Sequence, residues 1–314
     1  MNITVVGAGG LGGYFGGLLA RSGHRVTFVA RGAHLDALRR QGGLRLQTVH
    51  GEFFAPAEAA EAPPRAPAPD LVLFTVKSFD TAAAAEALRP AVGPETAVLS
   101  LQNGVDNEEY LARLFGPERV LGGVVYMLST IKEPGLVQQT GGPRTLTFGE
   151  WRGGLSDRVR HWERLMNDAG ILATATDDVV REKWVKFAFI CALAGMTALT
   201  RLPIGEIRAC PPSWEMFRQI LEEVVAVGGA RGVGLGRDVV ETHLTLAQRV
   251  EPHVTSSLHY DLIHGKRLEV EALHGTVVRY GREAAVPTPA CEAVYAALLP
   301  HHLRAGRVAA PPPT

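Results

Sequence analysis

The chain has 314 residues, which is enough for two domains of ordinary size. Its formal net charge is zero and 20% of its residues are charged, so neither nucleic acid nor an anionic membrane is an expected partner. The three cysteines are widely spaced and form no C-x-x-C pair, as in a cytoplasmic protein with reduced thiols. No basic segment precedes the first apolar residues, so no signal peptide is expected.

A glycine-rich turn follows the first apolar run. Residues 2–7 are typical of a buried parallel strand, and Gly7, Gly9 and Gly12 make the pattern G-x-G-x-x-G. A helical pattern and a second strand at residues 25–31 come next, which is the context of a Rossmann-type dinucleotide-binding domain. A glycine turn without a ligand is the alternative. The cofactor-binding residues predicted at this turn are Gly7, Ala8, Gly9, Gly10, Leu11 and Gly12.

The end of the second strand indicates which cofactor is bound. NAD-binding folds place an acid about 20 residues past the glycines, where it binds the ribose 2′-hydroxyl. Here Ala30 and Arg31 stand in that place. Arg31 would bind a 2′-phosphate through its charge and its two-pronged guanidinium group. The sequence therefore predicts NADP(H), and a solvated surface arginine is the alternative.

Two later strands are predicted to end in polar residues. The apolar runs at residues 70–77 and 95–103 read as buried strands that end at Lys77 and Asn103. Ligands of open parallel sheets bind beyond the carboxyl ends of the strands, so both residues are candidates to contact the nicotinamide or the substrate. Residues that only cap the strands are the alternative. A hairpin is also predicted at residues 44–57, and three strands at residues 120–130, 135–141 and 145–151. A helix capped by Ser156 should follow at residues 156–170, and a last strand at residues 171–177.

The second half is predicted to be helical. A helix should begin at Asp177 or Asp178 and carry Lys186 into an apolar run of about a dozen residues, shorter than the ~20 that span a bilayer. Lys183 stands beside charged neighbours and is expected to be solvated. The expected domains are 1–176, which binds NADP(H), and 177–314, which is all-α. No compact metal motif occurs, and the tail 308–314 is expected to be disordered.

Seven segments, in this order and spacing, resemble the ketopantoate reductase (2-dehydropantoate 2-reductase) family over nearly the whole chain. The resemblance implies hydride transfer from NADPH to the 2-keto group of a small 2-keto acid. It implies that Lys186 is the general acid, that Glu269 holds the substrate and that Ser257 is a substrate-binding hydroxyl. Lys77 and Asn103 match the family's residues at the strand ends. The segments are ITVVGAGGLGG, VARGAHLDAL, TVKSFD, QNGVDN, EKWVKF, TSSLHYD with RLEVEALHG, and VPTP.

The chemistry explains why a charge would open an apolar run. Hydride transfer to a ketone places negative charge on oxygen, and a nearby ammonium group stabilises that charge and delivers the proton. An apolar surrounding also lowers the pKa of a lysine. The alternative for Lys186 is a lysine whose aliphatic stem lets the charge reach water.

The chain departs from the family pattern where the substrate would be recognised. The family has asparagines four and eight residues after the lysine, where this chain has Ile190 and Ala194. Two further asparagines of the family are replaced here by Ile204 and Val254. The expected function is reduction of ketopantoate to pantoate. A paralogue that reduces a more hydrophobic 2-keto acid and a non-catalytic NADP(H) sensor are the alternatives, and a homodimer is left open. The predicted substrate-binding residues are Asn103, Lys77, Ile190, Ala194 and Ser257, with Lys186 and Glu269 as the catalytic pair.

Overall fold

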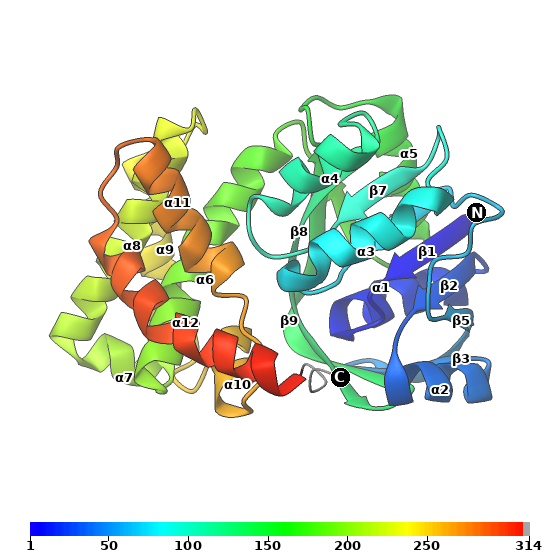
Figure 1. Ribbon diagram of the computed structural model, residues 1–314, viewed down its shortest axis with the longest axis horizontal. Helices are drawn as coiled ribbons and strands as arrows, with labels where there is room; N and C mark the ends of the chain where they lie inside the picture. Colours follow the sequence, from blue (N-terminus) through cyan, green and yellow to red (C-terminus); the bar gives the residue numbers. More distant parts are fainter. Residues whose placement is uncertain (310–314) are drawn as a thin grey trace. The chain divides into compact units, whose positions relative to one another are not determined.

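The computed structural model describes residues 1–309, and the chain divides into two compact units (Figure 1). The first unit comprises residues 1–102 and 107–180, and the second comprises residues 103–106 and the chain from residue 181 onward. The division along the chain therefore falls at residue 180 rather than at residue 176. A short segment from the first half of the chain also groups with the helical unit, which the sequence analysis did not anticipate.

The first unit is built on a sheet that has ten strands within the described residues, in the order β4-β3-β9-β8-β7-β6-β1-β2-β5, with β10 beside β9. The run from β5 to β8 is parallel, and its order is that of a Rossmann fold, as predicted. The strands are β1 (Asn2–Val6), β2 (Arg25–Val29), β3 (Gly43–Thr48), β4 (Gly51–Pro56), β5 (Glu58–Ala60), β6 (Leu71–Phe74), β7 (Ala97–Ser100), β8 (Val120–Glu133), β9 (Leu136–Glu150) and β10 (Leu172–Ala175).

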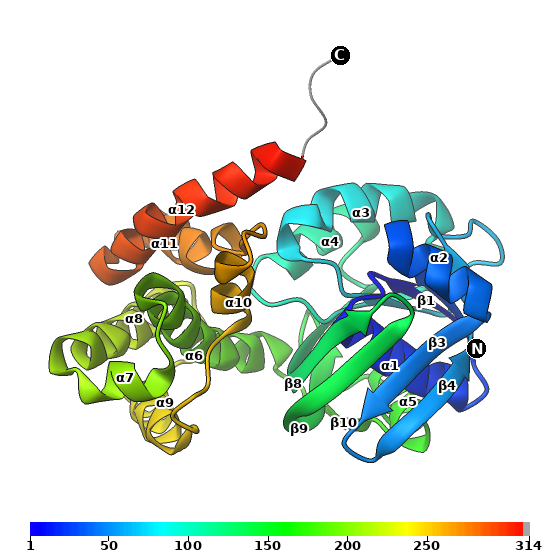
Figure 2. The same ribbon diagram turned by 90° about the horizontal axis from the view of Figure 1, so that it is seen from below.

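Helices cover both faces of this sheet (Figure 2). Along β6, Leu71 and Leu73 pack in the core that includes side chains of α1 and α5, whereas Val72 and Phe74 pack in the core that includes α3 and α4. This alternation explains why the strand reads as an unbroken apolar run, because both of its faces are buried. The helices are α1 (Gly10–Arg21), α2 (Gly32–Gln41), α3 (Thr81–Leu88), α4 (Asn107–Phe115) and α5 (Asp157–Asp168), with the 3₁₀ turns η1 (Ser78–Asp80) and η2 (Arg89–Ala91).

Several local predictions for this unit are confirmed and others are wrong. The hairpin of β3 and β4 is present, and Ser156 caps α5 by accepting a hydrogen bond of 3.1 Å from the Val159 N–H group. The two strands expected at residues 135–141 and 145–151 are one strand, β9, because pairing with β8 continues across the glycines between them. Strands β6 and β7 end three residues before Lys77 and Asn103, which therefore lie in the following loops.

The second unit is helical. Its helices are α6 (Val179–Thr200), α7 (Ile204–Ala209), α8 (Pro211–Ala230), α9 (Arg237–Arg249), α10 (Ser257–Ile263), the π-turn η3 (Glu271–Gly275), α11 (Thr276–Glu283) and α12 (Pro289–Ala309). Helix α7 is a short element that the sequence did not predict. Since α12 continues to Ala309, the tail expected to be disordered begins in a helix, and the rest of that prediction lies outside the described residues.

Helix α6 is longer than its uncharged run suggested. With 22 residues it is long and apolar enough to cross a membrane by length and composition alone. However, 61% of its most apolar window is buried inside the protein, which is the pattern of a core helix. Its charged first turns account for the difference, because they lengthen the helix without lengthening the uncharged run.

Candidate active site

The glycine turn between β1 and α1 has two positions at which a side chain would not fit. Gly7 has φ +105°, and a Cβ there would lie 2.8 Å from the Val76 nitrogen. A Cβ at Gly12 would overlap the Gly7 carbonyl oxygen and the Thr75 hydroxyl, whose oxygen donates a 2.7 Å hydrogen bond to that carbonyl. The first turn of α1 is therefore held tightly against the end of β1.

The second glycine of the motif, Gly9, leaves open space instead. Gly9 is the N-cap of α1, and no heavy atom would lie within 4 Å of a Cβ at this position. The N-terminus of α1 thus combines unpaired N–H groups and a positive dipole end with room for a ligand, which fits the pyrophosphate of a dinucleotide. Arg31 is exposed and is the N-cap of the next helix, α2.

The long hairpin of β8 and β9 packs against this turn, a contact that the sequence did not predict. A Cβ at Gly10 would overlap the backbone of Ser129 in β8, so the hairpin of β8 and β9 packs directly on the start of α1. At the tip of the hairpin, the Gly135 N–H group donates a 3.1 Å hydrogen bond to Nδ1 of His34 in α2. Only the run of adjacent glycines hinted at this close packing.

Lys186 lies at the centre of a polar group in the helical unit. Its Nζ donates a 3.0 Å hydrogen bond to Oδ1 of Asn103, a residue 83 positions earlier in the chain. Burial, together with the charge of Lys183, lowers the pKa of Lys186 from 10.5 to about 7, and the charge of Glu269 opposes the shift. A lysine with this pKa gives up its proton readily near neutral pH.

The expectation that Lys183 is solvated is wrong, because Lys183 is only 4% exposed. The helical period gives the reason. Lys183 shares a side of α6 with Phe187 and Cys191, which lie four and eight residues further on and are buried. The charged neighbours of Lys183 in the sequence lie on other sides of the helix. This buried second lysine is one cause of the low pKa of Lys186.

Glu269 is buried and lies in a segment that is fixed at two points. The Nδ1 atom of His302 in α12 is 2.6 Å from the Leu268 carbonyl oxygen. In the π-turn that follows, Nε2 of His274 donates a 3.0 Å hydrogen bond to the Cys191 carbonyl oxygen of α6. Burial lowers the pKa of His274 to about 4, so this imidazole is neutral near pH 7. These contacts hold the segment of Glu269 against the helix that carries Lys186.

The approach of His274 to α6 depends on a glycine. A Cβ at Gly195 would lie 2.5 Å from Nε2 of His274. The π-turn that presents this histidine is a rare element, and such turns are frequent at functional sites. Neither contact had a recognisable signal in the sequence.

The predicted substrate residues occupy different surroundings. Ile190 is half-buried, whereas Ala194 is 2% exposed. Ser257 is exposed at the start of α10, and its neighbour Ser256 is the serine that reaches α6, with its Oγ 2.8 Å from Oγ1 of Thr197. The spacing of Lys186, Ile190, Ala194 and Thr197 along an unbroken α6 keeps them within one side of the helix.

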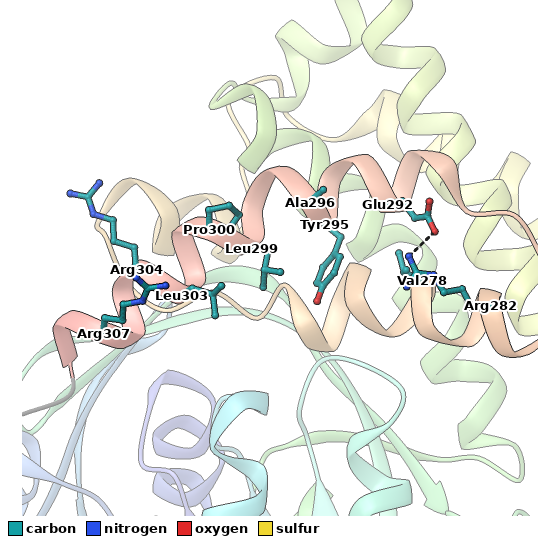
Figure 3. A pocket seen from close by; sticks show the side chains of 10 residues that line it. All are labelled: Val278, Arg282, Glu292, Tyr295, Ala296, Leu299, Pro300, Leu303, Arg304 and Arg307. Carbon is teal, nitrogen blue, oxygen red and sulfur yellow. Dashed lines mark hydrogen bonds and ion pairs between the residues drawn. The ribbon is translucent and has the colours of Figure 1, made fainter. Parts of the chain in front are cut away.

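The helical unit also contains a groove away from these residues. It has a volume of about 940 Å³ and runs along α11 and α12, where an ion pair of 3.2 Å joins Arg282 and Glu292 (Figure 3). None of the predicted site residues lines it. Within residues 1–309, no group of three or more His, Cys, Asp or Glu residues is placed to hold a metal ion.

Two family models match the chain in sequence. Residues 3–153 match the model described as ketopantoate reductase PanE/ApbA, and residues 178–301 match the model of its C-terminal domain. The chain belongs to the ketopantoate reductase family. It is therefore an oxidoreductase, as the order of its motifs indicated.

Ketopantoate reductases of known name and structure resemble the chain over nearly its whole length. The 2-dehydropantoate 2-reductase of Halobacterium salinarum is 35% identical over 292 residues, which cover 92% of this chain and 95% of the relative. The crystal structure of a PanE/ApbA family ketopantoate reductase from Ralstonia eutropha JMP134 is 34% identical, with a TM-score of 0.90 and coverage of 98% and 100%. A D-mandelate dehydrogenase in complex with NADH and anilino(oxo)acetate shares the fold at 19% identity and a TM-score of 0.89, with coverage of 98% and 99%.

Ketopantoate reductase membership establishes the reaction class, and the roles of individual residues stay predictions. The helical unit brings together Lys186, Asn103 and, through its charge, Glu269. Lys77 and Arg31 belong to the sheet unit, where both are exposed.

Proposed function

We propose that the protein reduces the keto group of a 2-keto acid with NADPH, with Lys186 as the general acid and ketopantoate as the substrate. The observation that carries this proposal is the Lys186 ammonium group, whose pKa is lowered to about 7 and which is hydrogen-bonded to Asn103. Family membership supports 2-dehydropantoate 2-reductase activity in general.

Each residue has a defined task in this proposal. Bound NADPH supplies the hydride to the keto carbon, and Lys186 donates a proton to the oxygen that becomes the hydroxyl. Before that transfer, the Lys186 charge stabilises the developing alkoxide in a site that α6 shields from water. Glu269 accepts a hydrogen bond from a substrate hydroxyl, and Asn103 keeps the Lys186 ammonium group in place.

The cofactor assignment rests on the sheet unit. The space at Gly9 and the N-terminus of α1 fit a pyrophosphate. Arg31, exposed at the start of α2, would bind the 2′-phosphate that distinguishes NADPH from NADH. Ala30 in place of an acid supports the same choice, because an acid there would repel the phosphate. We also propose a cytoplasmic location, and whether the protein forms a homodimer stays open.

A second candidate substrate is a 2-keto acid with a branched or aromatic apolar side chain. The observation that favours it is Ile190, half-buried one turn after Lys186 and therefore on the same side of α6. An isoleucine there cannot pair the primary hydroxyl of ketopantoate, and an unpaired buried hydroxyl costs about 1–3 kcal/mol. Since the fold is shared with a D-mandelate dehydrogenase, aromatic 2-keto acids belong in the comparison.

The test is a panel of 2-keto acids assayed by NADPH absorbance, with kcat/KM compared for ketopantoate and for branched and aromatic analogues. The highest kcat/KM for ketopantoate supports the leading proposal, and the highest value for an apolar analogue supports the second. Ile190→Asn should then shift the ratio toward ketopantoate by about 10-fold for one recovered hydrogen bond. NADPH binding without turnover of any of these acids would contradict both and favour a sensor.

A further inference from the structure

The four residues Asn103–Asp106 form a strap that belongs to the helical unit, although β7 before it and α4 after it belong to the sheet unit. One end of the strap is anchored on α11. The Asp106 Oδ2 atom accepts hydrogen bonds of 3.0 Å from Oγ1 of Thr276 and 2.7 Å from Nη2 of Arg279. Thr276 and Arg279 are three positions apart and share one side of the helix.

The charges of this anchor are complementary, because the Asp106 carboxylate and the Arg279 guanidinium group form an ion pair of 2.7 Å. Burial alone would lower the pKa of Arg279, but the hydrogen bond and the charge of Asp106 raise the pKa overall, as expected for a favourable ion pair. The Asp106 side chain is 26% exposed, which limits the access of water to the carboxylate.

The other end of the strap contacts Lys186. The side-chain Oδ1 atom of Asn103 accepts the 3.0 Å hydrogen bond from Nζ of Lys186. Three peptide units separate Asn103 from Asp106 and span at most roughly 11 Å, so an anchored Asp106 restricts where the Asn103 amide can lie. Gly104, with φ +97°, gives the strap the turn that points its two ends to different partners.

We propose that Asp106 is a positioning residue: its contact with Thr276 and Arg279 holds the side-chain oxygen of Asn103 against the Lys186 ammonium group. The effect on catalysis rests on the proposed function, but the effect on Lys186 itself does not.

The direction of the effect follows from the groups that face Lys186. An accepted hydrogen bond stabilises the ammonium form, as does the charge of Glu269, whereas burial and the charge of Lys183 oppose it. When the anchor is lost, the Asn103 acceptor becomes mobile and the ammonium form loses the stabilisation that this hydrogen bond provides. The pKa of Lys186 then falls below its value in the intact protein.

The titration of Lys186 can be measured directly in the full-length protein without substrate. The chain has five lysines, so lysine labelled with ¹³C at Cε yields a spectrum in which Lys186→Met identifies the signal of Lys186. Asp106→Ala and Arg279→Gln should both lower the pKa read from that signal, and Arg279→Lys should restore part of the shift. Arg282→Gln is the matched control, because it removes an ion pair one turn along α11 that does not involve the strap.

Kinetics provide the second measurement. Losing one hydrogen bond to Lys186 should lower kcat by about 2- to 12-fold in Asp106→Ala, while KM for NADPH stays unchanged. The proposal is overturned if Asp106→Ala is folded and the pKa of its Lys186 equals that of the wild type. If Asp106→Ala does not fold, Arg279→Gln decides in the same way. A wild type without turnover would contradict the proposed function, and the titration would still test the anchor.

Discussion

The glycine turn and the Lys186 centre are two sites built in opposite ways. The turn uses backbone atoms within six consecutive residues, and side chains there are excluded by the Gly7 and Gly12 geometry. The Lys186 centre uses side chains from segments that are more than 80 residues apart in the chain. The glycine turn provides free space for a ligand, whereas the Lys186 centre provides an amino group whose pKa is set by its surroundings.

This contrast shows which changes each site tolerates. A backbone site fails when a side chain fills it, so its sensitivity depends on free space at each glycine. A site made of distant side chains fails when a charge, or the element that holds it, is removed. The following predictions test whether the two sites differ in this way.

The largest effect is expected at Lys186. Replacing it with methionine removes the proton donor and should lower kcat by about 10²–10⁴-fold, with NADPH affinity largely retained. Because the buried charge disfavours folding, the same substitution should raise Tm. Lys266→Met, at an exposed lysine, is the control. A Lys186→Met enzyme with near wild-type turnover of its best substrate would show that another residue is the acid.

The next effect concerns the cofactor. Arg31→Ala should raise KM for NADPH by about 10- to 150-fold, the worth of a charge-assisted hydrogen bond of ~1.5–3 kcal/mol, and should leave KM for NADH unchanged. The comparison is made by steady-state assays with both cofactors. Arg40→Ala, at an exposed arginine of α2, should affect neither. Equal effects of Arg31→Ala on the two cofactors would remove the basis for choosing NADPH.

A smaller effect separates two glycines of the same turn. Gly12→Ala places a methyl group against the Gly7 carbonyl oxygen and should cost about 1–3 kcal/mol of unfolding free energy. Gly9→Ala places it in open space and should leave Tm close to that of the wild type. Instead, Gly9→Ala should weaken NADPH binding. Thermal unfolding and fluorescence titration with NADPH distinguish the two variants. An equal decrease of Tm in both would contradict the finding that a methyl group has room at Gly9 but not at Gly12.

The smallest effect is a displacement of the pH profile. The proposed mechanism requires the protonated form of Lys186, so kcat/KM should be constant well below pH 7 and fall about 10-fold per pH unit well above it. Lys183→Met removes a positive charge that lowers the pKa of Lys186, so the inflection should move to higher pH. An inflection that moves the other way would mean that Lys183 does not act on Lys186 through its charge.

Local patterns in the sequence predicted most of the sheet unit. The apolar runs of β1 and β6, the glycine turn, the hairpin of β3 and β4 and the cap at Ser156 each depend on residues close together in the chain. The extent of β9 was wrong because strand pairing overrode the local glycine signal. In the helical unit, the residue types around Lys183 suggested solvent exposure, and packing of one side of α6 decided otherwise.

The sequence by itself determined the Rossmann motif and the family, because both are recorded in short segments and their order. Only the tertiary structure decided that Asn103 reaches Lys186, that Asp106 is anchored on α11 and that His274 fits against Gly195. The physical reason is that a pKa and a hydrogen bond depend on distance in space. The folded chain brings these groups within 3 Å although up to 173 positions separate them in sequence.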